Sequence, residues 1–109
     1  MRSAPKIVVS SLLLVGTAAV AQVDTFAGNV NAAMDRMHRA MMVEPSGNVD
    51  RDFARMMVPH HQGAIDMAEA ELRFGKDERL RRLAQGIIVE QRQEIVLMQA
   101  ILADERKSQ

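Results

Sequence analysis

Apolar residues recur every three or four positions along most of the chain, which is the spacing of one face of an α-helix. Three stretches follow this pattern, at about residues 24–42, 50–74 and 78–104. No stretch has the strict alternation of apolar and polar residues that marks a half-buried strand. We therefore expect an all-α fold, a small up-down bundle of three main helices, in which two copies can pair to complete the core.

Capping and turn residues mark the ends of the predicted helices. The N-caps that we expect are Asp24 for the first helix, Asp50 or Asn48 for the second and Asp77 for the third. Gly75 follows the second helix and is expected to stop it.

Pro59 lies inside the second predicted helix. A proline there removes a backbone hydrogen bond, and its ring clashes with the preceding turn. We expect this helix either to kink at Pro59 or to break there, with a new helix beginning at Pro59. In both cases the irregularity falls beside His60.

The apolar stripes of the first two helices contain thioether and imidazole groups as well as aliphatic ones. With about 100° between successive residues, one face of the first helix collects Ala27, Val30, Met34, Met37, His38 and Met41. One face of the second helix collects Phe53, Met56, Met57, His60, Ala64, Met67 and Ala68, with His61 at its edge. We expect both faces to point inward, where they meet the stripe of the third helix: Leu80, Leu83, Ala84, Ile87, Gln91, Glu94, Ile95, Met98, Ile101 and Leu102.

Two polar residues, Gln91 and Glu94, interrupt the apolar stripe of the third helix. A carboxylate among apolar neighbours is costly unless it is paired, and the histidines of the second helix are the available partners. We therefore expect Glu94 and Gln91, with Met98 on the same stripe, to support a metal-binding histidine or to be ligands themselves.

Residues 1–21 have the pattern of a secretory signal peptide. Basic residues precede an apolar run from Ile7 to Val20, and Ala19-Val20-Ala21 is a small-residue cleavage site. The run is too short to span the roughly 30 Å core of a bilayer, although an uncleaved N-terminal anchor stays as the alternative. We expect residues 22–109 to form one mature domain, in the periplasm or secreted.

The composition narrows the possible functions. The chain has no Cys, Trp or Tyr but nine Met, and 14 basic residues balance 14 acidic ones. Without cysteine, disulfides and thiolate metal sites are excluded, so helix packing, a metal or a second copy must stabilise this small exported domain. No basic patch with interleaved aromatic residues indicates nucleic-acid binding.

Imidazole and thioether groups together suit copper, above all Cu(I), and by extension Ag(I). The potential ligands are spaced so that they project from one side of each helix: Met34, Met37, His38 and Met41 on the first, and Met56, His60 and Met67 on the second. Calcium and magnesium would need clustered oxygen ligands, and the carboxylates lie mostly on the outward faces. Zinc stays open as the less favoured metal, because His60, His61 and Glu94 are three possible ligands for it.

The run Phe53-x-x-Met56-Met57-x-Pro59-His60-His61-Gln62-Gly63-Ala64-Ile65-x-Met67-Ala68 closely resembles the core motif of the domain of unknown function 305 family. The likeness covers about Asn31 to Leu102, including the upstream Met34-x-x-Met37-His38-x-x-Met41. The resemblance implies a ferritin-like helical bundle and, by analogy with exported bacterial members, copper binding. By position it points to His60, His61, Met56, Met57 and Met67, with His38, Met37 and Met41 as a second cluster. The family often has Trp near the end of the last helix, where this chain has Ile101.

Two classes of function fit these observations. The first is an exported protein that sequesters Cu(I) or hands it to another copper-handling protein. The second is a small structural or interaction module without metal, because a methionine stripe also packs well against a partner helix. An enzyme is not expected, because the chain has no His-Glu-x-x-His motif, no duplicated Glu-x-x-His, no Cys nucleophile and no phosphate-binding loop.

Overall fold

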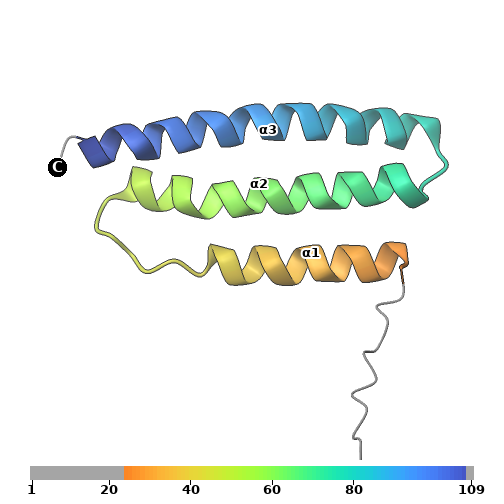
Figure 1. Ribbon diagram of the computed structural model, residues 1–109, viewed down its shortest axis with the longest axis horizontal. Coiled ribbons are helices and arrows are strands. Elements are labelled where there is room, and N and C mark those ends of the chain that lie inside the picture. The colour runs from red at the N-terminus through yellow and green to blue at the C-terminus, as the bar shows by residue number, and fades with distance from the viewer. Residues whose placement is uncertain (1–23, 108–109) are drawn as a thin grey trace, which may run out of the picture.

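The computed structural model describes residues 24–107 of the chain, with side chains as far as Asp104. Within these residues the chain forms α1 (Phe26–Met41), α2 (Val49–Phe74) and α3 (Glu78–Lys107), which run in alternating directions (Figure 1). The described range contains no strand, so the predicted all-α, up-down fold is confirmed. The predicted signal peptide lies outside the described residues. No helix between residues 24 and 107 has the length and apolar character that crossing a membrane requires.

The N-cap of the first helix lies one residue later than predicted. The side-chain Oγ1 of Thr25 accepts a hydrogen bond from the backbone N–H of Gly28 at 3.1 Å, so Thr25 is the N-cap and the prediction of Asp24 is wrong. Asp24 has another role, because its carboxylate pairs with the guanidinium of Arg73 near the end of α2. This ion pair ties the start of α1 to the end of α2.

The other predicted helix ends agree with the structure. Asn48 caps α2, since its Oδ1 accepts a hydrogen bond from the backbone N–H of Arg51 at 3.0 Å. Gly75 follows the last residue of α2. The carboxylate of Asp77 accepts from the backbone N–H of Arg79 at 2.8 Å, which satisfies one of the free donors at the start of α3.

Helix α2 passes through Pro59 without a break. The predicted alternative of two separate helices is therefore wrong, whereas a bend at Pro59 stays a prediction. A proline removes one backbone hydrogen bond, but α2 packs against a helix on each side over much of its length. Because the tertiary contacts of both halves favour the same helix axis, the loss of one bond does not end the helix.

The three helices lie in one layer, with α2 in the middle (Figure 1). α1 packs on α2 and α2 packs on α3, but in the described part of the chain no Cα atom of α1 comes within 8 Å of one in α3. The bundle is therefore open, since no helix covers the two broad faces of the layer. The ferritin-like detail of the predicted fold stays a prediction.

Small side chains form most of the core of this layer: Ala33, Ala54, Ala68, Ala70 and Ala84 are buried, with the larger Ile65, Ile88 and Met98. Ile65 leaves 2% of its surface exposed, and it packs with Ala68, Ala84 and Ile88 between α2 and α3. A middle helix has its neighbours on two flanks. It therefore buries two narrow stripes of small residues, and the broad stripe between them stays open.

The predicted inward faces are consequently wrong in several places. Phe53 on α2 is 58% exposed, and His60 is also exposed. On α3, Leu80 and Leu83 are 52% and 59% exposed, whereas Ile88, outside the predicted stripe, is buried. The packed sides overlap the predicted faces in part, because Ala68, Ala84 and Met98 are buried as predicted.

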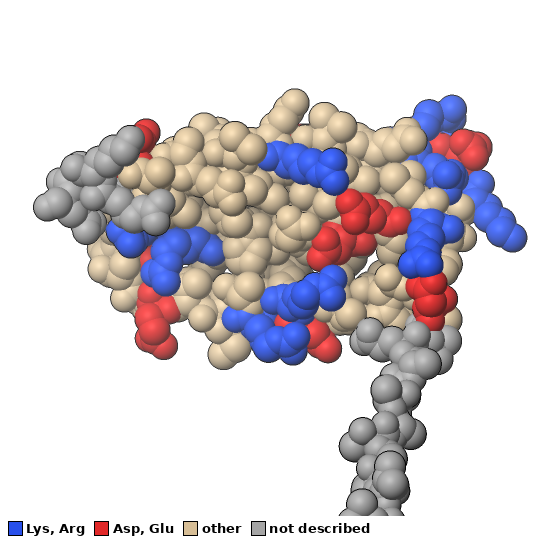
Figure 2. Space-filling model, viewed as in Figure 1, with Lys and Arg blue, Asp and Glu red and all other residues tan. Residues whose placement is uncertain are grey.

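One broad face of the layer carries charged side chains of both signs that lie beside one another across the helices (Figure 2). Two ion pairs join neighbouring helices through α2: Arg36 of α1 with Asp66 at 3.2 Å, and Arg92 of α3 with Glu69 at 3.3 Å. Asp66 and Glu69 lie about 140–160° around α2 from Ala64, at roughly 100° per residue. The opposite broad face is therefore the one to which Ala64 belongs.

Candidate metal centre

Most of the predicted ligands lie on that opposite face of the layer. On α1, Arg36 pairs with Asp66 on the charged side, whereas Met37, one residue further round the helix, packs against Gly63 between α1 and α2. These two contacts fix how α1 is rotated about its axis relative to α2. The directions of the remaining thioether and imidazole groups then follow from the helical spacing of about 100° per residue. We call this surface the Met/His face, and its members are Met34, Met37, His38 and Met41 of α1 and Phe53, Met57, His60, Ala64 and Met67 of α2.

The ligands predicted on α1 differ in exposure. Met34 is 38% exposed and His38 is also exposed, so both are open to solvent on the Met/His face. Met37 and Met41 are half-buried, because they lie nearer to α2. The Met37 contact with α2 is close, since a Cβ added at Gly63 would lie 2.5 Å from the Met37 Sδ. Because Gly63 has no side chain, Met37 of α1 can lie directly against α2. The sequence alone did not indicate this role of Gly63.

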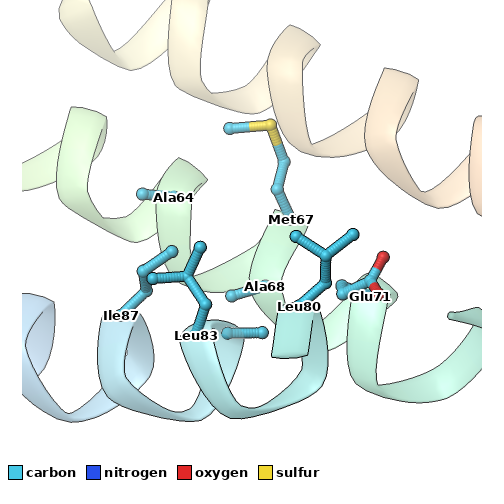
Figure 3. Close-up of a pocket in the computed structure, with 8 residues that line it drawn as sticks. Ala64, Met67, Ala68, Glu71, Leu80, Leu83 and Ile87 are labelled. Atoms are coloured by element: carbon cyan, nitrogen blue, oxygen red, sulfur yellow. The ribbon is translucent and has the colours of Figure 1, made fainter. Parts of the chain in front are cut away.

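On α2, the imidazole of His60 is exposed, while Met56, Met57 and Met67 are half-buried. Met56 lies on the side of α2 that faces α1. The side chain of Met67 extends from α2 away from α3 and toward α1 (Figure 3). Thioether groups of both helices are thus directed to the strip where α1 and α2 meet, which depends on how α1 packs on α2.

His61 is held differently from His60. Its side chain is 14% exposed, and its Nε2 contacts Oε2 of Glu94 on α3. The other ring nitrogen, Nδ1, is buried without a hydrogen-bond partner. The predicted contact between Glu94 and a histidine of α2 is therefore confirmed, and it orients the imidazole. The rings of His60 and His61 are 6.0 Å apart between centroids.

The other two residues predicted on α3 are placed less favourably for a metal. Met98 is buried, with 9% of its surface exposed, and the only helix of the described part that packs against α3 is α2. It is therefore a core residue between these helices. Gln91 is half-buried, and no hydrogen bond of its side chain is found in the described part of the chain.

No three side chains of the His, Asp or Glu type converge on one point between residues 24 and 104. Of the three possible zinc ligands, His61 and Glu94 are in contact, and His60 points outward beside them. The sulfur groups are the more numerous donors on this face. The donor set therefore fits a soft ion better than zinc, which prefers nitrogen and oxygen ligands in the absence of thiolates.

An apolar groove of about 300 Å³ continues the Met/His face onto α3. Leu80, Leu83 and Ile87 of α3 project beside Ala64 and Met67 of α2, and Glu71 lies at one end (Figure 3). We call this the α2–α3 groove. This groove could not be predicted from the sequence, because leucines have the same spacing whether they line an open groove or a closed core.

Comparison with known proteins identifies the family of the chain. The family model described as Domain of unknown function (DUF305) matches residues 15–102, which include all the predicted ligands and supporting residues. The chain belongs to the DUF305 family. The resemblance seen in the Met-x-Pro-His-His-Gln-Gly-Ala motif is thereby confirmed.

One relative of this DUF305 protein is the uncharacterized protein L153 of Acanthamoeba polyphaga mimivirus. The two are 43% identical over 60 residues, which make up 55% of this chain and 39% of the relative. The chain thus matches less than half of that protein. Neither the family description nor the relative's name assigns a ligand, so the function must be argued from the site.

Proposed function

We propose that this DUF305 protein is an exported copper-binding protein that sequesters Cu(I), or hands it on, without turnover. The observation that supports this best is the common location of the thioether and imidazole groups. Met34, Met37 and Met41 of α1 and Met57, Met67 and His60 of α2 share one open face of a single layer. Soft thioether donors with imidazole are the ligand set that favours Cu(I), and they would also bind Ag(I).

The exposure of these groups supports a role in holding and transferring an ion. His60, His38 and Met34 are accessible in a single copy of the chain, so an ion can approach them there without unfolding any helix. Half-buried methionines beside them have flexible side chains that can adjust around the ion. Such a site suits exchange with another copper-handling protein better than a permanently enclosed cofactor.

His61 would contribute in a more constrained way. Glu94 holds its Nε2, so Nδ1 is the nitrogen that remains for a metal. A carboxylate on the far nitrogen of a histidine ligand is a common support, because it fixes the ring orientation and raises the basicity of the donor. Glu94 is therefore proposed as the supporting residue and His61 as a ligand.

The proposal is tested first at the histidines. The double variant His60→Ala/His61→Ala should lose more than about tenfold in Cu(I) affinity, because the loss of supporting groups alone costs 10–100-fold at typical sites. A competition titration against a chromophoric Cu(I) chelator under reducing conditions measures this. Gln62→Ala is the matched control, since Gln62 is exposed on the charged side of the same turn of α2. Equal affinity of the histidine variant and the wild type would contradict the proposal.

The same titration separates ligand methionines from packing methionines. Leucine has nearly the volume of methionine, so Met34→Leu/Met37→Leu/Met41→Leu should change stability by less than about 1.5 kcal/mol. It removes three sulfur atoms, so Cu(I) affinity should fall if they are ligands. Met42→Leu is the control, because Met42 follows α1 and is 85% exposed. Unchanged affinity in the triple variant would leave these methionines with a packing role only.

Export is part of the proposal and rests on the pattern of residues 1–21. When the chain is expressed in a bacterium with its own leader, the mature protein should be recovered from the periplasm or the medium. N-terminal sequencing should then begin at Gln22. Recovery of the full-length chain from the membrane fraction would favour the uncleaved anchor instead.

The alternative function is an interaction module whose Met/His face docks a partner. The large exposed apolar side chains of the described residues favour it, Phe53 and Leu83 among them. Failure of the wild type to compete for Cu(I) in the titration above would leave this alternative as the better explanation of the face.

A further inference from the structure

The Met/His face and the α2–α3 groove together form one broad open surface that nothing in the described chain covers. Large apolar side chains stand out from it: Phe53 of α2 and Leu80 and Leu83 of α3 are each more than half exposed. Monomeric soluble proteins rarely expose an apolar patch much larger than a few hundred Å². This surface is therefore expected to have a partner.

The core between the helices is small. Five of its eight buried apolar residues are alanines, and no large side chain in the described residues is completely buried. Small domains without disulfides or a large core usually depend on metals or on association. The chain has no cysteine, so covering the open surface is the physical means that remains for burying its leucines and phenylalanine.

The distribution of charge indicates which partner fits. The ion pairs of Arg36 with Asp66 and of Arg92 with Glu69 join neighbouring helices on the opposite face of the layer. The carboxylates of the open surface are Glu94, which is held by His61, Glu71 at the end of the groove, and the exposed Glu90, seven residues after Leu83 on the same side of α3. Residues 22–109 have 12 basic and 14 acidic residues, because Arg2 and Lys6 lie in the predicted signal peptide, so two copies do not repel each other strongly. A partner with strong charge has little to bind here, whereas a second copy brings the same apolar area.

The open surface also has enough area for a stable interface between two copies. α2 has 26 residues, and at about 1.5 Å per residue it is about 39 Å long. Neighbouring helix axes are about 9 Å apart, so three helices, of which α1 is the shortest, give roughly 900 Å². A stable interface buries about 800 Å² on each partner. The open surface is therefore large enough for a homodimer.

We infer that two copies of this chain pack with their open surfaces together, as a two-layered dimer of six helices. The contact is isologous, which means that the same residues of both copies meet across a two-fold axis. Leu80, Leu83 and Phe53 then become buried, and the charged faces point outward to solvent. The Met/His face lies inside this dimer, although the inference itself rests on apolar area and not on metal binding.

The test uses the full chain in metal-free buffer with a chelator, so that it does not depend on the copper proposal. At about 50 µM, sedimentation equilibrium or light scattering should give the mass of a dimer. Leu83→Glu places a charge on the open surface. It should raise the dissociation constant of the dimer at least about tenfold. Val89→Glu is the matched control. Val89 and Leu83 lie on the same helix and are equally exposed, at 58% and 59%, but Val89 points away from the open surface. The control should remain dimeric.

A second variant keeps the test decisive if Leu83→Glu does not fold. Because the natural chain has no cysteine, Ala64→Cys introduces a single thiol near the middle of α2, on the open surface. Mild oxidation should link it to its equivalent in the second copy, since a two-fold axis through the centre of the surface brings the two thiols together. Gln62→Cys, on the charged side of α2, should link much more slowly.

Three results would overturn the inference: a monomeric wild type at this concentration, equal dissociation of Leu83→Glu and Val89→Glu, or equal cross-linking of the two cysteine variants. A monomeric wild type would indicate that another segment, such as residues 1–23, or a different protein covers the surface. The failure of one proposal can be told from the failure of the other, because mass in chelator reports pairing without metal and the competition titration reports Cu(I) affinity.

Discussion

At the scale of single residues, Gly63 shows how little space separates α1 from α2. A Cβ at Gly63 would lie 2.5 Å from Sδ and 3.1 Å from Cβ of Met37, whereas one at Gly86 of α3 would meet nothing within 4 Å. Both glycines are inside helices, where alanine gains about 0.5–1 kcal/mol, but overpacking costs about 1–3 kcal/mol. We expect Gly63→Ala to lower the free energy of unfolding by about 1 kcal/mol and Gly86→Ala to raise it, as measured by urea unfolding. Equal stabilisation by both would show that Met37 moves aside freely.

At the scale of the elements, the start of α3 depends on pH through Asp77. Hydrogen bonds from the side chain and backbone of Arg79 lower the pKa of Asp77 from 3.8 to about 2. A lowered pKa in the folded state stabilises the fold above pH 3.8, and this stabilisation disappears as the pH falls through about 2. In urea unfolding, wild type should therefore exceed Asp77→Asn in stability at pH 5, and the difference should vanish near pH 2. Asp35→Asn, at an exposed position on α1, is the control, and an equal pH dependence there would argue against the cap.

At the scale of the whole molecule, a ligand that binds only the folded state must raise its stability. The added free energy should be easy to detect in an open layer with a small core, because few buried contacts stabilise it. Cu(I) at about 100 times its dissociation constant should add about 2.7 kcal/mol to the free energy of unfolding. Thermal unfolding monitored by circular dichroism measures this, and the rise should shrink in His60→Ala/His61→Ala. An unchanged midpoint of the wild type would favour the interaction module over the copper protein.

The elements themselves could be predicted because their signals are local. Helical periodicity, the caps Asn48 and Asp77 and the stop at Gly75 depend on residues within a turn or two of each other. The contact between a histidine of α2 and Glu94 was predictable for a related reason, since a carboxylate in an apolar stripe needs a partner. Of the two alternatives predicted at Pro59, a kink or a break, the break is wrong because packing on both sides of α2 outweighs the local propensity.

Local patterns in the sequence specify that the chain is helical, where each helix begins and ends to within a few residues, and which side of each helix carries the thioether and imidazole groups. The packing of the three helices leaves much of this side open, and no local pattern shows that. A hydrophobic pattern records that a surface avoids water, but it does not record which neighbour covers it. That depends on the order in which the helices lie, and with α2 in the middle, Leu83 and His60 face outward while Ile65 and Ile88 are buried.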